Sequence, residues 1–268
     1  MPSSRIPVVP SPPRRHVDLA PLEGKGIWLT TWRSSHPDVK AVVARVHDAG
    51  LDQIWVRTGS STDGFYGGRL LAQLVPLAHA EGISVIAWDF PTLSNPAADA
   101  RRAGEAFEKG ADAFSPDIET PSEGTHLGVL RARYYLSLVR HEAGNKPVVA
   151  TVFPPNSYWA HVYPYSAMAP FVDAFAPMVY WSCSEPGAAV AQAIEGLRRW
   201  KPVVPVGQDF DMGPMGGRQG LPTPAEIWRF LDVAHRLGAP GASLFDLESG
   251  GPEQLSTLGA YPWTVRSH

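Results

Sequence analysis

The chain has 268 residues, of which 44% are hydrophobic and 18% are charged, and its formal net charge is −3 at pH 7. This length suits one large domain such as an α/β barrel, and the composition is that of an ordinary globular protein. A small negative charge without a dense Lys/Arg cluster argues against nucleic acid and against an anionic membrane surface as partners. Cys183 is the single cysteine, which excludes an intrachain disulfide and a cysteine-based zinc site.

Residues 1–24 are rich in proline and arginine, and we expect them to form a flexible arm ahead of a barrel domain spanning residues 25–268. The arm lacks the apolar segment of a secretory signal, so no export signal is expected. No apolar run approaches the roughly 20 residues that cross a bilayer, so membrane insertion is not expected. The sequence leaves the cellular location and the oligomeric state open.

From Gly26 onward, short apolar runs typical of strands alternate with amphipathic stretches typical of helices. The expected strands are Gly26–Trp32, Gln53–Thr58, Ser84–Phe90, Ala113–Glu119, Val148–Phe153, Ala174–Trp181, Val203–Asp209 and Ala242–Leu247. The expected helices between them are Asp38–Ala49, Arg69–Ala80, Ala97–Lys109, Leu127–Glu142, Ala188–Arg199 and Pro224–Leu237. Several of these helices are followed by a glycine, the usual signal for a helix end: Gly50, Gly82, Gly110 and Gly238.

This alternation predicts an α/β protein with a parallel sheet that is buried on both faces. Eight repeats of roughly 30 residues favour a single-domain (β/α)₈ TIM barrel. An open, doubly wound sheet is the alternative, but no glycine-rich phosphate loop follows the first expected strand.

The carboxyl ends of the strands carry the active site in such a barrel. Aromatic, acidic and amide side chains, with few cations, dominate these ends. The candidate substrate-binding residues are Trp32, Arg57, Asp89, Trp181, Gln208, Asp209, Phe245 and Asp246. Aromatic rings pack against the C–H faces of sugars and carboxylates bind their hydroxyls, whereas a phosphorylated substrate would require anion nests and cations. We therefore expect a carbohydrate substrate, although Trp181 and its neighbour Tyr180 fit core packing equally well.

The most informative segment is the fourth expected strand and its end, Asp112–Glu119. Side chains alternate along a strand, so Ser115, Asp117 and Glu119 share one face. Two neighbouring carboxylates in a confined site cannot both ionise cheaply, so one tends to keep its proton at neutral pH, as general acid catalysis requires. A structural salt-bridging role is the alternative for this pair.

We expect neither a metal nor a cofactor. A metal site of oxygen ligands from Asp89, Asp209, Asp211, Asp246 and Glu248 is a less favoured alternative, since no Asp-x-Asp-x-Asp-Gly loop supports it. No Gly-x-Ser-x-Gly elbow occurs, which argues against a Ser-His-Asp hydrolase.

The fourth-strand segment resembles the motif Asp-Gly-x-Asp-x-Asp-x-Glu of the chitinase-like glycoside hydrolases of family 18. Asp112, Asp117 and Glu119 match it, whereas Ala113 replaces the glycine and Ser115 replaces the middle aspartate.

Two other strands extend the resemblance, which runs loosely over residues 26–250. Pro177–Trp181 is similar to the family's Met-x-Tyr-Asp, with Trp181 in the last position. Gly241–Asp246 is similar to its eighth strand, with Phe245 where a tryptophan is common, and the third-strand Ser-x-Gly-Gly is absent. Asp117-Ile118-Glu119 also resembles the fourth strand of the family 25 lysozymes.

The resemblance implies a substrate-assisted reaction on a β-linked polysaccharide containing N-acetylglucosamine, such as chitin or peptidoglycan. Glu119 would be the general acid, Asp117 would orient the 2-acetamido group, and Tyr180 would hydrogen-bond to it. In a two-carboxylate scheme Glu119 would instead pair with a carboxylate across the pocket, such as Asp209 or Asp246, with a retaining or inverting outcome. A catalytically silent barrel that binds carbohydrate or a protein partner is the alternative function.

Overall fold

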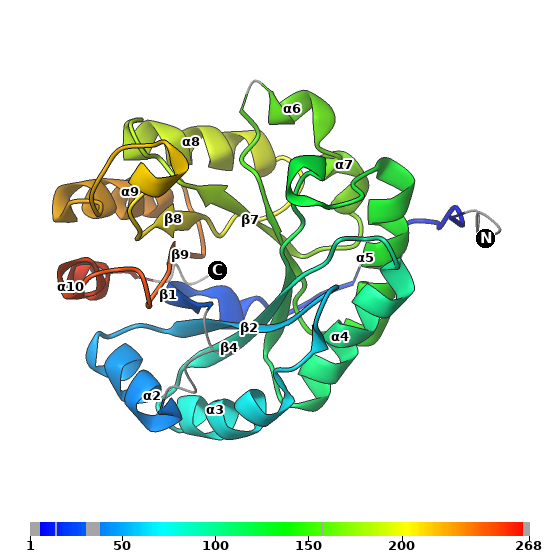
Figure 1. Ribbon diagram of the computed structural model, residues 1–268, viewed down its shortest axis with the longest axis horizontal. Coiled ribbons are helices and arrows are strands. Elements are labelled where there is room, and N and C mark those ends of the chain that lie inside the picture. Colours follow the sequence, from blue (N-terminus) through cyan, green and yellow to red (C-terminus); the bar gives the residue numbers. More distant parts are fainter. Residues whose placement is uncertain (1–5, 14, 31–37, 157, 265–268) are drawn as a thin grey trace.

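The computed structural model describes residues 6–13, 15–30, 38–156 and 158–264. Parallel strands surround a central axis and helices cover their outer side (Figure 1). The strands of the barrel are β1 (Gly24–Leu29), β2 (Gln53–Ser60), β4 (Ser84–Phe90), β5 (Ala113–Pro116), β6 (Val149–Val152), β7 (Ala174–Val179), β8 (Val206–Gln208) and β9 (Gly241–Phe245). A short strand, β3 (Gly64–Phe65), pairs antiparallel with the end of β2.

Helices follow the strands along the chain. The α-helices are α2 (Val39–Asp48), α3 (Gly68–Ala80), α4 (Pro96–Glu108), α5 (Val129–Ala143), α6 (Trp159–Val162), α7 (Tyr165–Met168), α8 (Pro186–Leu197), α9 (Pro224–Arg236) and α10 (Pro252–Ala260). The 3₁₀ turns are η1 (Ala20–Leu22), η2 (Pro121–Glu123) and η3 (Gly213–Met215). Local sequence explains the start of α9, where Thr223 and Glu226 form a reciprocal capping box around Pro224.

The strand order around the barrel is β5-β4-β2-β1-β9-β8-β7-β6, and neighbours in this order run parallel. The circle closes at a β5–β6 seam, where Phe114 pairs with Val148 and Asp117 pairs with Thr151 through isolated bridges. Two backbone hydrogen bonds, of 3.1 and 3.0 Å, accompany these bridges. The predicted (β/α)₈ barrel is therefore confirmed.

Two apolar clusters build the core. The larger one lies between the strands and the helices and contains, for example, Ile54, Phe114 and Phe230. The smaller one fills the inside of the barrel and includes the tryptophans Trp28, Trp55 and Trp88. Because Trp28 stacks on Trp55 with ring centroids 4.8 Å apart, much of the barrel interior is solid aromatic packing.

Strand ends differ from the expected ones where the ladder loses its partners. β1 ends at Leu29 because the amide of Thr30 donates to the Glu248 carboxylate, 3.0 Å away, instead of to a neighbouring strand. The expected strand from Val203 shortens to β8, since Pro205 lacks an N–H and Val203 keeps one isolated bridge.

The boundary after residue 24 stays a prediction. Within that segment Leu22 is fully buried in the inner apolar cluster, and the carbonyl oxygen of Val9 accepts a hydrogen bond of 3.0 Å from Arg133 on α5. No helix in the described ranges is long and apolar enough to cross a membrane.

Candidate active site

One layer of inward side chains crosses three adjacent strands. Arg57 of β2 is in register with Trp88 of β4, which is in register with Ser115 of β5. Asp117 lies one inward position further along, at the carboxyl end of β5, and Glu119 follows it. Sequence alternation therefore brings Arg57, Asp117 and Glu119 to the end of the barrel where active sites are found.

The Asp117 and Glu119 carboxyls are half-buried. Asp117 Oδ1 and Glu119 Oε2 are fully buried and have no hydrogen-bond partner in the described part of the chain. Burial raises the pKa of Glu119 well above its ordinary value, and the charges of Asp117 and Glu123 raise it further. Burial also raises the pKa of Asp117, against the opposing charge of Arg57. The pair thus favours a protonated Glu119 at neutral pH.

Ser115 lies beneath the carboxyls and is completely buried. Its hydroxyl lies 2.8 Å from the carbonyl oxygen of Val149 and 2.7 Å from the Thr151 hydroxyl. These contacts tie β5 to β6 at the seam. At the position where the family 18 motif has its middle aspartate, this barrel therefore has a neutral hydroxyl, that of Ser115, hydrogen-bonded to β6.

Tyr180 follows β7 and lies next to the two carboxyls. Burial raises the pKa of its phenol well above the ordinary value, with further contributions from Asp117, Glu119 and Asp246. Its ring packs edge-on against Phe210, with centroids 5.1 Å apart. Tyr180 is therefore close enough to Asp117 and Glu119 to be affected by their charges, and its catalytic role stays a prediction.

Tyr163 is a site residue that sequence reasoning missed. It comes from the connection between α6 and α7, and its hydroxyl donates a hydrogen bond to the carbonyl oxygen of Ile118, between the two carboxyls. Burial raises the pKa of Tyr163 well above the ordinary value, and Glu119 is the next largest cause. The sequence carries no pattern for this bond beyond the nearby Tyr165 at the start of α7, whose ring stacks on that of Tyr163 with centroids 4.8 Å apart.

Phe245 at the end of β9 lines the same end of the barrel. Its ring lies 5.8 Å from that of Trp28, 5.9 Å from that of Tyr180 and 6.4 Å from that of Trp88, measured between centroids. It therefore joins the tryptophans of the interior to the tyrosine of the site. This apolar surface is of the kind on which a sugar ring packs.

Gln208 is fully buried and uses its amide on the protein itself. Its Oε1 accepts a hydrogen bond of 2.9 Å from the Ser182 amide, and its Nε2 donates one of 2.9 Å to the Phe210 carbonyl. These bonds hold the loops after β7 and β8. Gln208 thus supports the Tyr180–Phe210 contact from below.

Asp246 and Asp209 form a second pair of buried carboxyls. Asp246 accepts hydrogen bonds from the hydroxyls of Thr30, at 2.9 Å, and Ser249, at 2.6 Å. Asp209 Oδ1 is buried without a partner within the described residues, and burial together with Asp246 raises the pKa of Asp209 to about 8. The backbone of Gly250 lies so close that an added Cβ would be 2.2 Å from Asp209 Oδ2.

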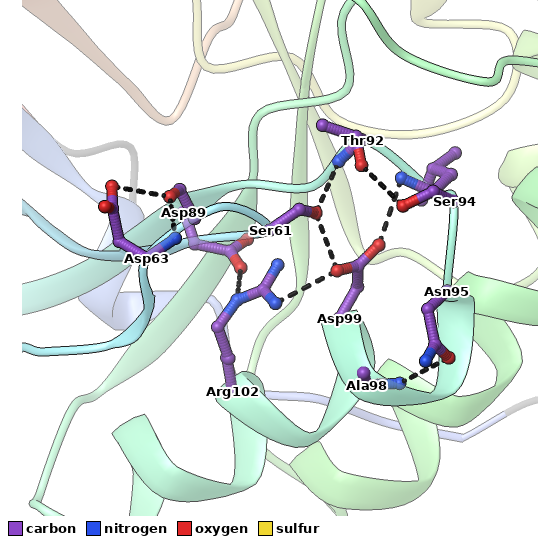
Figure 2. Close-up of polar contacts among 11 residues, drawn as sticks. Ser61, Asp63, Asp89, Thr92, Ser94, Asn95, Ala98, Asp99 and Arg102 are labelled. Atoms are coloured by element: carbon purple, nitrogen blue, oxygen red, sulfur yellow. Dashed lines mark hydrogen bonds and ion pairs between the residues drawn. The ribbon is translucent and has the colours of Figure 1, made fainter.

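Asp89 points away from the barrel interior because its neighbour Trp88 occupies the inward position. Its Oδ2 accepts a hydrogen bond of 2.5 Å from Arg102 Nε, and Arg102 Nη1 lies 3.0 Å from Asp99 Oδ1 (Figure 2). Asp99 also accepts a hydrogen bond of 2.7 Å from the Ser61 hydroxyl (Figure 2). The Leu93 amide donates a further one, of 3.0 Å, to Asp99. The expected substrate ligand Asp89 thus belongs to a buried ion network between β4 and α4.

Trp181 is also turned outward, since Tyr180 takes the inward position. It is buried and packs on Phe230 of α9, with ring centroids 5.4 Å apart. Trp181 thus packs in the core between the barrel and α9, the alternative considered for it from the sequence. Trp32, the remaining candidate, lies outside the described residues.

Across the described part of the chain, no group of three or more His, Cys, Asp or Glu side chains is arranged to hold a metal ion.

No family model and no curated protein matches the sequence. The fold, however, resembles that of solved structures. A GH18 chitinase from Pseudoalteromonas aurantia superposes with a TM-score of 0.63 at 12% identity, covering 88% of this chain and 98% of that one. The spore cortex-lytic enzyme SleL of Bacillus megaterium QM B1551 gives 0.62 at 10% identity, covering 91% and 75%.

Barrels of other activity resemble this chain as well. A putative deoxyribose-phosphate aldolase from Toxoplasma gondii ME49 gives a TM-score of 0.58 at 15% identity, covering 88% of this chain and 90% of that one. At such identities the likeness establishes a shared barrel fold and no shared activity.

Proposed function

We propose that this protein is a glycoside hydrolase that cleaves a β-linked polysaccharide containing N-acetylglucosamine, of the chitin or peptidoglycan type. The observation that carries the proposal is the pair of inward, half-buried carboxyls at the end of β5, Asp117 and Glu119, each with a buried oxygen that lacks a partner among the described residues. Such a pair holds a proton at neutral pH, which a general acid needs.

In the proposed reaction Glu119 protonates the glycosidic oxygen while its bond to the anomeric carbon breaks. Asp117 orients the 2-acetamido group, whose carbonyl oxygen attacks the anomeric carbon, and Tyr180 donates a hydrogen bond to that group. Water then opens the cyclic intermediate and gives its proton to the Glu119 carboxylate. The proximity of Tyr180 to both carboxyls supports this division of roles.

The position of Lys25, the lysine on the described strands, favours glycoside hydrolysis over the Schiff-base chemistry of an aldolase. Covalent catalysis on a carbonyl substrate through a Schiff base needs a lysine amine at the site. Among the described strands, Lys25 of β1 lies at the opposite end of the barrel, where its Nζ donates to the Gly259 carbonyl oxygen at 2.5 Å.

Turnover of chitooligosaccharides and of purified peptidoglycan by the wild type and by Glu119→Gln tests the proposal. Loss of the general acid is expected to slow cleavage roughly 10²–10⁴-fold. Glu105→Gln, a change of the same kind at an exposed position of α4, is the matched control. The proposal fails if the wild type cleaves none of these glycans, or if Glu119→Gln cleaves them at the wild-type rate.

A catalytically silent barrel that binds carbohydrate or a protein partner is the second candidate. Ser115 favours it, because a hydrogen-bonded hydroxyl stands where the resembled motif has a carboxylate next to Asp117. Glycan binding by the wild type and by Glu119→Gln, without turnover by either, would support this second function.

A further inference from the structure

Arg57 of β2 is a cation at the carboxyl end of the barrel. Its side chain is half-buried, and its guanidinium lies over the ring of Trp88, with Cζ 5.1 Å from the ring centroid. Arg57 Nε is fully buried and has no hydrogen-bond partner within the described ranges. Arg57 is also close enough to Asp117 to lower the pKa of that carboxyl against the effect of burial.

Two other buried arginines of this protein, Arg102 and Arg140, are paired with carboxylates of the protein itself. Arg102 binds Asp89 and Asp99, at 2.5 and 3.0 Å. Arg140 binds Asp173 and donates to the carbonyl oxygens of Phe171, at 3.1 Å, and Lys146, at 2.9 Å. Arg57 differs from both, because within the described residues its guanidinium has an aromatic face, no carboxylate in an ion pair and no acceptor for Nε.

An unsatisfied donor that is partly removed from water costs free energy unless a ligand supplies the acceptor. A guanidinium presents a planar fork of N–H groups that matches the two oxygens of a carboxylate. The Trp88 ring holds that plane in place, so the fork is preorganised rather than mobile.

We propose that Arg57 binds a carboxylate carried by a sugar of the substrate, so that the site selects an acidic glycan over a neutral one. This inference rests on the proposed function and narrows its substrate class. Two sugars carry a carboxylate of this chemistry: N-acetylmuramic acid, on its lactyl group, and a uronic acid, at C6.

Binding by the Glu119→Gln variant separates recognition from turnover. The probes are oligosaccharides of alternating N-acetylglucosamine and N-acetylmuramic acid, oligosaccharides of alternating N-acetylglucosamine and glucuronic acid, the carboxyl-reduced form of each, and chitotetraose. Titration calorimetry is repeated with Arg57→Gln added to Glu119→Gln, and with Arg101→Gln added as the control. Arg101 is an exposed arginine of α4, so this control removes the same charge from the surface.

With Arg57 present, at least one acidic oligosaccharide is expected to bind roughly 10- to 100-fold more tightly than its reduced form. Arg57→Gln is expected to bring this ratio close to one, and Arg101→Gln to leave it unchanged. The acidic probe that shows the ratio identifies the source of the carboxylate. Thermal melts of each variant establish that it is folded.

The inference is overturned if both acidic glycans bind no better than their reduced forms. It is equally overturned if Arg57→Gln weakens acidic and reduced ligands by the same factor, which is the result expected if Arg57 serves Asp117 alone. An Arg57-dependent ratio in a protein whose wild type cleaves none of the probes supports the inference and contradicts the proposed hydrolysis.

Discussion

Replacing Arg102 with methionine is expected to destabilise the barrel strongly. Arg102 is 4% exposed and is the counter-charge for two carboxylates that are equally removed from solvent, Asp89 and Asp99. Removing one partner of a buried ion pair costs about 3–5 kcal/mol, because the remaining charge stays buried without compensation. For a domain of this size such a loss lowers the melting temperature by roughly 6–20 °C.

The loss is also expected to depend on pH. Burial already raises the pKa of Asp89 to about 6, and the charge and hydrogen bond of Arg102 keep it from rising further. When the pKa of a carboxyl is higher in the folded state than in the unfolded state, the folded protein loses stability as the pH rises from the unfolded-state pKa to the folded-state pKa. In the wild type this loss is complete near pH 6. In Arg102→Met the pKa of Asp89 is higher still, so the loss continues above pH 6. The difference in unfolding free energy between the wild type and the variant is therefore expected to be larger at about pH 8 than at about pH 5.

Thermal unfolding followed by circular dichroism at these two pH values measures both effects. Arg101→Met changes the neighbouring exposed residue of α4 and is expected to stay within about 0.5 kcal/mol of the wild type. A deficit of Arg102→Met below about 1 kcal/mol, or one of equal size at both pH values, would refute the reasoning about this network.

Two further predictions concern buried carboxyls. Glu119 acts as an acid in its protonated form, and its pKa is raised. As the pH rises, kcat/KM on a cleaved glycan is therefore expected to fall only well above the ordinary carboxyl range. A pH–rate profile in which kcat/KM already falls with rising pH through the ordinary carboxyl range contradicts this. Asp209, whose pKa is raised to about 8, costs the folded protein stability as the pH rises toward that value, so Asp209→Asn is expected to match the wild type within about 1 kcal/mol near pH 4 and to become the more stable protein by about pH 8. Melting temperatures across this range measure the crossover, and parallel curves for the two proteins would rule it out.

The sequence contained enough to predict the barrel and most of its strands. β4 was predicted with its observed bounds, and α9 starts at Pro224 as expected, because both are specified by local pattern and capping. α10 was missed although Gly251-Pro252-Glu253 carries the proline and acidic residue of a helix start.

Alternation decides which candidates reach the site. It correctly grouped Ser115 with Asp117, and the same rule applied to β4 turns Asp89 outward once Trp88 is inward. Tyr180 and Trp181 divide in the same way. The alternation can be read from the sequence, but it does not tell which residue of each pair points into the barrel. That choice depends on the volume that the opposing strands leave free.

Other parts of the site depend on contacts between distant segments. Tyr163 reaches the Ile118 carbonyl across 45 positions of the chain, and nothing in the local pattern of either segment indicates that bond. The pairing of Arg102 with Asp89 likewise depends on how α4 packs on the barrel. Tertiary packing, rather than propensity, determines these contacts.

The β5–β6 seam has a consequence for motion at the site. Every other pair of neighbouring barrel strands shares at least two consecutive register pairs, whereas here isolated bridges and the Ser115–Thr151 hydroxyl contact hold the barrel closed. Local opening of a protein requires least free energy where the fewest backbone bonds must break. Asp117 and Glu119, which follow β5, therefore lie beside the line of the barrel where local separation costs least. Small shifts of the acidic pair toward a bound sugar leave intact the ladders among β1, β2 and β4, the strands that hold the interior tryptophans.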